Sequence, residues 1–594
     1  MFPTIAYIIG CFLIALTLKG RAARWSSWIL VGSCVLLCTA YLVKDQMPFA
    51  GFSLSSLWAR QTASDGSAVP GTEETPATRE IHSGPSWLVK SSTSLIGARF
   101  SELGSLGGSS IAARVGAGLY LIGILAILVQ PRYGLYAILF FSLLGDVFLH
   151  PWYPFVKGFS ARESLFFVHD AFIVSPLELY VLLTAISWLA RQVGRGQLNC
   201  FLGRLFWPTL FFLAFLLFGL AHGIGTGGDL RIALWEARAI FYLVALMVLA
   251  SNLVETTAHV SHLIWIAMVA LLIKGLYASL YYLLVLQGDL SSVRTISDHA
   301  AAIQLNSLFV LSFAVWVYDS SRMKRALLPL MIPFVVLGYI AMQRRAAFIT
   351  LAIAVILLIA LLYQRQRRIV ALTLAILSVG YLAIFWHSYS LLAVPAQAIK
   401  SAIVGEQGSD EDQRSQASDE DQRSNDYRVI ENRNINFTIH QHPFAGVGFG
   451  QKFYIIAPMP DISWFEWWEY ITHNSIMWIW MKAGIGGFFS ILFLIGLTVF
   501  TGVRTLHLRP ADDLSAVILT ATLYVVMHFI FACVDISWTA QSMVYVGTMM
   551  GLVNSAERIG SPGANKATIR IRGWKMSAGA PFHSPPLVKE PQTL

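Results

Sequence analysis

Two pairs of polar side chains stand beside long uncharged stretches of this sequence. Arg344 and Arg345 separate the apolar runs 326–343 and 346–364, and His473 and Asn474 precede the run 483–503. The planar guanidinium fork of arginine stays charged and binds phosphate oxygens bidentately. Histidine accepts protons near neutral pH, because its unperturbed pKa is about 6.5. The two adjacent arginines therefore indicate an anionic binding partner, and the histidine is a candidate proton acceptor.

The elements that position these side chains are predicted membrane helices. The chain has 594 residues, 56% of them hydrophobic and 13% charged, with a mean hydropathy of +0.62. A bilayer core needs about 20 apolar residues per helix, so we expect an all-α polytopic membrane protein with about 12–15 transmembrane helices and one large outer-face loop. The fifteen runs that carry this count are 4–18, 25–43, 115–130, 133–149, 171–190, 205–221, 239–251, 260–287, 300–318, 326–343, 346–364, 369–386, 483–503, 515–532 and 538–553.

The net charge of +9 is concentrated in loops between these runs, which argues against a nucleic-acid partner. Each basic cluster falls on the same side of the predicted zigzag of helices. The positive-inside rule makes that side cytoplasmic, so we expect the N-terminus outside and the C-terminus inside. The clusters are Lys19, Arg21 and Arg24; Arg191, Arg195 and Arg204; Arg322, Lys324 and Arg325; Arg365, Arg367 and Arg368; Arg504 and Arg509; and six more Lys and Arg in the tail 554–594.

The large outer loop changes character along its length. It contains a near-identical nine-residue acidic repeat, 408–416 and 417–425, and then becomes aromatic and glycine-rich. A solvated spacer thus leads into a segment that can pack on the membrane surface. The predicted parts of the chain are a transmembrane hairpin (1–43), a flexible outer loop (44–110), a transmembrane bundle (111–386), the large loop (387–473), the C-terminal helices (474–553) and a basic tail (554–594).

The segment from Arg428 to Gly450, with the pair His473-Asn474, resembles the O-antigen ligase and polymerase superfamily of membrane glycosyltransferases. In that family a helix-like stretch begins with Arg and ends in a Pro-x-x-Gly-x-Gly-x-Gly turn. A His-Asn pair follows, then nine residues, here 475–483, and then Gly-x-x-Gly. The sequence Gln343-Arg-Arg-Ala-Ala-Phe also resembles the family's Arg-Gly/Ala-x-Leu helix start. The resemblance covers roughly residues 229–553.

The resemblance implies glycosyl transfer at the outer face of a bacterial inner membrane, without nucleotide sugar, metal or other cofactor. The donor would be a glycan linked to undecaprenyl diphosphate, and the acceptor a sugar hydroxyl of a glycan or glycolipid. O-antigen ligase, polysaccharide polymerase and protein oligosaccharyltransferase all remain open. The alternative from another class is a flippase for the lipid-linked glycan, which would use the same arginines without needing His473.

Within this frame His473 is the expected general base, and four arginines are candidates for binding the donor diphosphate, with at least one of Arg344 and Arg345 expected to do so. Arg345 is favoured over Arg344 by the family pattern, while Arg238 begins a helix at the outer face and Arg428 begins the helix-like stretch. The alternatives are a capping or interfacial histidine and arginines that snorkel to lipid headgroups.

Nearby glutamates are possible ion-pair partners for two of these arginines. Arg428 has Glu431 three residues on as a possible partner. A pair between Arg238 and Glu236 is not expected, because residues two apart do not share a helix face.

The glycines and the aromatic residues allow two interpretations each. Gly446, Gly448 and Gly450 predict a turn at which backbones approach closely, or alternatively backbone N–H groups of Gly448 and Gly450 beside the diphosphate. Asn474 is predicted to bind substrate with His473. The short stretch 475–483 is expected to form a helix along the interface. Its predicted interface anchors are Trp478 and Trp480. An aromatic belt or a sugar-stacking surface is predicted from Trp464, Trp467, Trp468 and Tyr470. Glu466 and Glu469 are the fallback general bases.

Other polar residues are given structural interpretations. The pairs Asp410/Asp412 and Asp419/Asp421 resemble a metal-binding Asp-x-Asp motif, but their repetition indicates a spacer. The five cysteines show neither metal-ligand spacing nor a disulfide framework. Ionisable groups within membrane spans often mark function. No role is assigned to the three found here, Asp146, Glu178 and Lys274, or to His528 in a later run.

Overall fold

The computed structural model describes the chain in segments: residues 2–17, 32–34, 108–145, 155–160, 169, 174–196, 200–289, 296–297, 300–318, 321–364, 367–388, 390–404, 415–460, 467–509 and 512–560. Side chains of 108–117 and 415–425 are outside this description. So are the predicted loop 44–110, apart from its last three residues, and the tail beyond residue 560.

Most of the described part of the chain is helical, and no strand occurs in it, which confirms the all-α prediction. The first group is α1 (Phe2–Thr17), α5 (Gly108–Val129), α6 (Pro131–Leu144), α7 (Pro176–Gly194), α8 (Phe206–Gly225), α9 (Leu230–Leu253) and α10 (Thr257–Leu280) with a π-helical end (Tyr281–Val285). The second is α11 (Ala301–Val317), α12 (Arg322–Ala341), α13 (Arg345–Gln364), α14 (Arg368–Phe385), the 3₁₀ turn Leu391–Ala393, α15 (Val394–Val404), α16 (Ser415–Gln441), α17 (Ser475–Leu508), α18 (Asp513–Phe531) and α19 (Ala540–Gly560).

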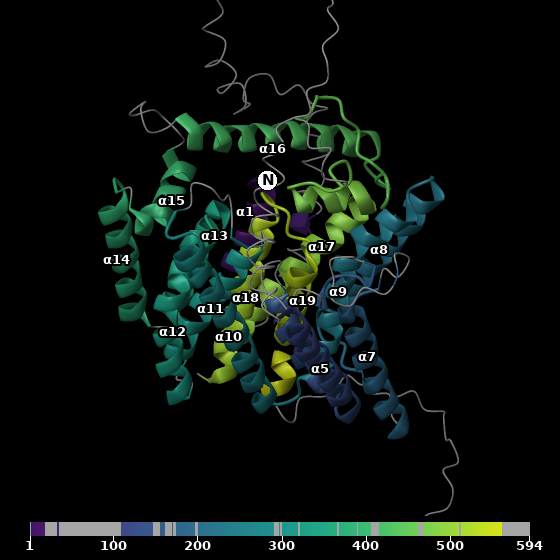
Figure 1. Ribbon diagram of the computed structural model, residues 1–594, viewed down its shortest axis with the longest axis horizontal. Coiled ribbons are helices and arrows are strands. Elements are labelled where there is room, and N and C mark those ends of the chain that lie inside the picture. The colour runs from purple at the N-terminus through teal and green to yellow at the C-terminus, as the bar shows by residue number, and fades with distance from the viewer. Residues whose placement is uncertain are drawn as a thin grey trace, which may run out of the picture.

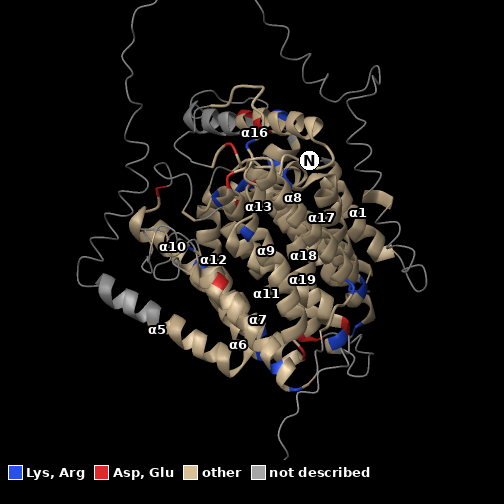
Figure 2. Cartoon of the chain, turned by 90° about the vertical axis from the view of Figure 1, so that its right-hand side faces the viewer, with Lys and Arg blue, Asp and Glu red and all other residues tan. Residues whose placement is uncertain are grey.

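The apolar runs form helices because each is a long segment with few charged residues. Every predicted run except 25–43, of which only 32–34 are described, coincides with one of these helices. In the described residues eight helices are long and apolar enough to cross a membrane, and five apolar helices are shorter. Figure 2 shows most Lys, Arg, Asp and Glu residues of the described chain toward the two ends of the bundle, with few of them in the band between. The chain is therefore a multi-pass membrane protein.

Interhelical contacts fix which helix ends share a side. Lys324, at the start of α12, forms an ion pair with Asp513 at the start of α18. The end of α18 meets the start of α17, where the Ser475 N–H donates to the Ala532 carbonyl at 2.8 Å. A helix of about 20 residues rises about 30 Å. The turn between α12 and α13, with Arg344 and Arg345, therefore lies on the same side as the start of α17.

Helix α16 lies across this end of the bundle, over the starts of α1, α13 and α17 (Figure 1). Its buried residues are spaced by three and four positions, which gives the helix one face toward the bundle. This face mixes apolar and polar side chains: Glu431, Asn434, Ile435, Thr438 and Ile439. The helix also begins at Ser415, inside the acidic repeat that was expected to be a solvated spacer.

Candidate functional site

The pair His473-Asn474 directly precedes α17, with Asn474 at its N-cap. The Asn474 side chain caps the helix by accepting the Met477 N–H at 3.2 Å, and its amide donates to Asn432 Oδ1 at 3.1 Å. The non-helical residue Gly484 (φ 68°, ψ −175°) interrupts α17 after nine residues. Both ends of the Asn474 amide are thus engaged within the protein, and its predicted role in substrate binding stays a prediction.

The nine-residue helix exists, but Trp478 and Trp480 are not the exposed interface anchors predicted for it. Residues 475–483 are all buried. The indole N–H of Trp478 donates to the Tyr470 carbonyl at 2.8 Å, and that of Trp480 to the Pro443 carbonyl at 2.8 Å. Both indoles therefore satisfy their polar atoms inside the protein instead of anchoring to headgroups.

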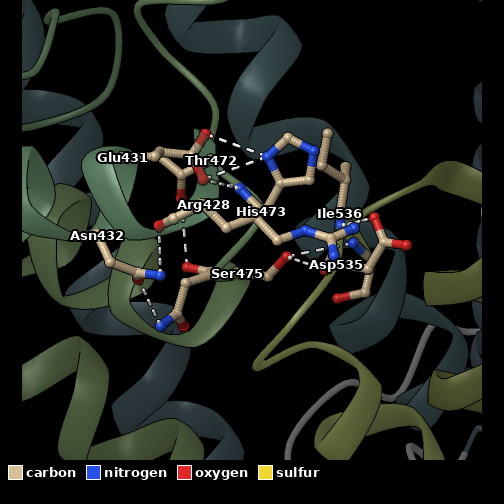
Figure 3. A network of polar contacts seen from close by, with 10 residues as sticks. Arg428, Glu431, Asn432, Thr472, His473, Ser475, Asp535 and Ile536 are labelled. Atoms are coloured by element: carbon tan, nitrogen blue, oxygen red, sulfur yellow. Dashed lines mark hydrogen bonds and ion pairs between the residues drawn. The ribbon is translucent and has the colours of Figure 1, made fainter. Parts of the chain in front are cut away.

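His473 faces a buried carboxylate of α16. Its backbone N–H donates to Glu431 Oε2 at 2.9 Å, and its Nδ1 lies 3.2 Å from both Glu431 oxygens (Figure 3). The Glu431 side chain is 1% exposed and that of His473 is 24% exposed. No described residue forms a hydrogen bond with Nε2 of His473. The imidazole therefore has one nitrogen held by the protein and one available for chemistry.

Two neighbours on α16 complete this environment. The Tyr427 ring meets the His473 ring edge to face at 5.4 Å, and burial, followed by the charge of Glu431, raises the pKa of the Tyr427 phenol. Figure 3 shows the Arg428 side chain running past His473 toward Asp535. The Nε atom of Arg428 is buried without a hydrogen-bond partner among the described atoms. No described ion pair joins Arg428 to Glu431, whose described ion-pair partner is His473.

The glycine turn lies between α8, α9 and the first segment of α17. Gly448 has a φ of 89°, and a Cβ there would lie 2.3 Å from the Gly223 Cα. Gly450 has a φ of 78°, and a Cβ there would lie 2.4 Å from the Asp229 carbonyl oxygen. The Gly450 N–H already donates to Glu236 Oε2 at 2.6 Å. Close backbone approach accounts for both glycines, while contact with a diphosphate stays a prediction.

A buried ion pair that the sequence analysis did not identify supports this turn. Lys482 Nζ lies 2.9 Å from Glu236 Oε1, and both side chains are 0% exposed. Lys482 also donates to the Gln451 carbonyl at 2.5 Å. The available signal was a lone lysine within the apolar stretch before Gly484, which implies a buried partner. The pair ties α9, the glycine turn and α17 together.

Arg238 lies within α9, which begins at Leu230, so the prediction that it begins a helix is wrong; its ion-pair partner is Glu178. Its Nε lies 3.5 Å from Glu178 Oε1, and Nη2 donates to the Val156 carbonyl at 3.3 Å. Tyr242 also donates to Glu178, which lies in the first turn of α7. No described ion pair joins Arg238 to Glu236, as expected from their spacing. Arg238 thus lies in an internal network, and diphosphate binding by it remains a prediction.

Arg344 and Arg345 lie at the turn predicted for them. Gln343 adopts a positive φ of 53°, and α13 begins two residues later. Arg345 is exposed and Arg344 is half-buried. This turn lies at the same end of the bundle as His473, so the structure brings the two cations and the histidine to one end.

The aromatic segment is partly described. Trp467 stacks on Trp235 of α9 with ring centroids 4.4 Å apart, and Glu469 forms an ion pair with Lys452. Trp464 and the fallback base Glu466 lie outside the described residues. The other fallback base, Glu469, is thus already engaged by a cation.

The remaining candidates are possible metal ligands and a lysine inside the bundle. No cluster of three metal-ligating side chains occurs among the residues that the structure describes. Asp410, Asp412 and Asp146 lie outside them, as do the side chains of Asp419 and Asp421. Elsewhere, Lys274 donates to Gln304 at 2.8 Å within the bundle.

Comparison with known families adds one match. Residues 307–492 match the family model described as O-Antigen ligase. The match runs from α11 into α17, so it contains every predicted site residue except Arg238, and it is narrower than the predicted 229–553. No curated protein matches the chain.

Proposed function

Because this chain carries a domain of the O-antigen ligase and polymerase superfamily, we propose that it transfers a glycan from a polyprenyl diphosphate to an acceptor hydroxyl. The domain indicates O-antigen ligase-type glycosyl transfer; undecaprenyl diphosphate as the donor carrier and a glycan or glycolipid as the acceptor are the finer parts of the proposal. The observation that carries it is His473, placed at the head of α17 with a partly exposed ring and no described partner at Nε2.

The reaction needs a base and a cationic environment for the leaving group. The acceptor O–H gives its proton to Nε2 of His473 as its oxygen bonds to the anomeric carbon of the donor sugar. The bond from that carbon to the diphosphate breaks, and polyprenyl diphosphate leaves. Arg344 and Arg345 stabilise the charge that develops on it, with Arg428 and Arg238 as further candidates. In this scheme the cations are arginine side chains and a metal ion has no part.

The charge distribution supports an outer-face site. Arg204 pairs with Glu557, Arg558 donates to the Ser251 carbonyl and Lys324 pairs with Asp513, all at the end opposite His473. By the positive-inside rule the end rich in Lys and Arg is cytoplasmic. We therefore place the protein in a bacterial inner membrane with His473 facing the periplasm.

Side-specific thiol labelling tests this orientation. A cysteine introduced at Gly408 should react with an impermeant reagent from outside the cell, and one at Gln366 should react only after the membrane is opened. Both positions lie outside the described residues, so neither change touches a described contact. The opposite labelling pattern would place the site on the cytoplasmic side and contradict the proposal.

Turnover of a defined donor tests the activity itself. Purified protein in proteoliposomes should convert a polyprenyl-diphosphate-linked glycan and an acceptor glycolipid to extended product and free polyprenyl diphosphate. Omission of the acceptor should stop product formation. Movement of the donor across the bilayer without any product would reject the transferase and favour a flippase.

A further inference from the structure

The Glu431 carboxylate is buried in a way that needs explanation. It is 1% exposed, and a buried carboxylate is costly unless hydrogen bonds satisfy it. The His473 backbone N–H donates to it at 2.9 Å, the His473 Nδ1 lies 3.2 Å away, and the Tyr427 phenol of the same helix also hydrogen-bonds to it. Among the described ion pairs the only basic partner of Glu431 is this imidazole. The carboxylate is therefore directed at His473 and not at a structural cation.

This geometry determines which nitrogen of His473 carries the proton. A neutral imidazole has one N–H and one acceptor nitrogen, and a carboxylate beside one nitrogen places the N–H there. Both Glu431 oxygens lie 3.2 Å from Nδ1. With the proton on Nδ1, the lone pair of Nε2 points away from Glu431. A ring in the opposite tautomer would have no lone pair available on its free nitrogen.

We propose that Glu431 is a positioning residue that holds His473 in the tautomer able to accept a proton at Nε2. The proposal rests on the function proposed above. Glu431 touches neither substrate nor reacting atoms, and it acts through the imidazole. Its second hydrogen bond, to the backbone of His473, fixes the position of the ring relative to α16.

Glutamine at position 431 separates this role from a packing role. The side chains have almost the same shape, and the amide oxygen can still accept the His473 backbone N–H. The amide NH₂ then faces Nδ1, which must become the acceptor, so Nε2 carries the proton. A general base contributes about 10²- to 10⁴-fold to rate. Glu431→Gln should therefore lower kcat by about 10²-fold or more, with little change in the donor KM.

Three further variants complete the test. Asp426→Asn removes an exposed negative charge from the same helix and should leave kcat unchanged. Glu431→Asp keeps the carboxylate in a shorter side chain, so it should be more active than Glu431→Gln. In a His473→Ala background, Glu431→Gln should cause no further loss, because residues that act as a unit are not additive.

The measurements are kcat, donor KM and thermal unfolding on the same purified preparations. Wild-type kcat in Glu431→Gln would overturn the proposal, as would an aspartate variant less active than the glutamine variant with both folded. A further tenfold loss in the His473→Ala background would show that Glu431 acts independently of the imidazole. Absence of transfer by the wild type would instead reject the proposed function, and full activity of His473→Ala would reject the base.

Discussion

Replacement of Lys482 by methionine should expose how strongly the glycine turn depends on a buried charge. Methionine nearly matches the length of the lysine side chain but lacks the ammonium. In the wild type, Lys482 Nζ contacts Glu236 Oε1 at 2.9 Å and the Gln451 carbonyl at 2.5 Å, without solvent exposure. Without the lysine, Glu236 keeps its hydrogen bond from Gly450 but loses its counter-charge.

The expected cost follows from this burial. Removing one partner of a buried ion pair costs about 3–5 kcal/mol, because the remaining charge stays in a medium of low polarity. Glu236→Gln should destabilise the wild type for the same reason. In the Lys482→Met background, however, Glu236→Gln removes the uncompensated charge and keeps an acceptor for the Gly450 N–H. The second change should therefore raise the free energy of unfolding of the single variant.

Unfolding of the purified protein in mixed micelles, followed by tryptophan fluorescence, measures these differences. The matched control is Lys452→Met, which breaks the pair with Glu469 where the lysine is 55% exposed. Exposed pairs contribute about 0–1 kcal/mol, so this control should change little. The reasoning fails if Lys482→Met costs no more than the control, or if Glu236→Gln destabilises Lys482→Met further.

Three other predictions concern the turn, the arginines and the acidic repeat. Gly448→Ala should lower stability and activity, because its Cβ would lie 2.3 Å from the Gly223 Cα, whereas Gly380→Ala, with no atom within 4 Å, should be tolerated in a thermal-unfolding comparison. Arg345→Lys should lose transfer nearly as completely as Arg345→Ala, because only the guanidinium binds phosphate bidentately. Deletion of 408–416 should leave transfer rates nearly unchanged in the presence or absence of a chelator, and activity restored by Mg²⁺ would contradict this.

The helices and the motif could be predicted from sequence because both are local properties. Apolar runs of about 20 residues specify membrane helices whatever surrounds them. The spacing from His473 to Gly484 likewise fixes a short helix, and the structure has one over 475–483. The turn at Arg344 follows from two spans with almost nothing between them. Predicting these features does not require knowing which helices contact one another in the folded protein.

The site's internal partners could not be predicted, because they depend on tertiary packing. Glu431 is 42 residues from His473 in sequence. Lys482 pairs directly with Glu236, which also accepts a hydrogen bond from the Gly450 N–H of the glycine turn. The error over Trp478 had a physical cause of the same kind. Tryptophan is typical of membrane interfaces and of packed cores, and the tertiary packing around residues 475–483 decides which environment applies here.

The most direct test of the central claim is transfer by His473→Ala and His473→Gln, measured with donor binding in the same preparation. Loss of a positioned general base should lower the transfer rate about 10²- to 10⁴-fold. Binding of the lipid-linked donor should remain, since the arginines are intact, and glutamine should not restore activity because an amide cannot take the proton. Wild-type transfer rates in either variant would contradict the assignment of His473 as the catalytic base.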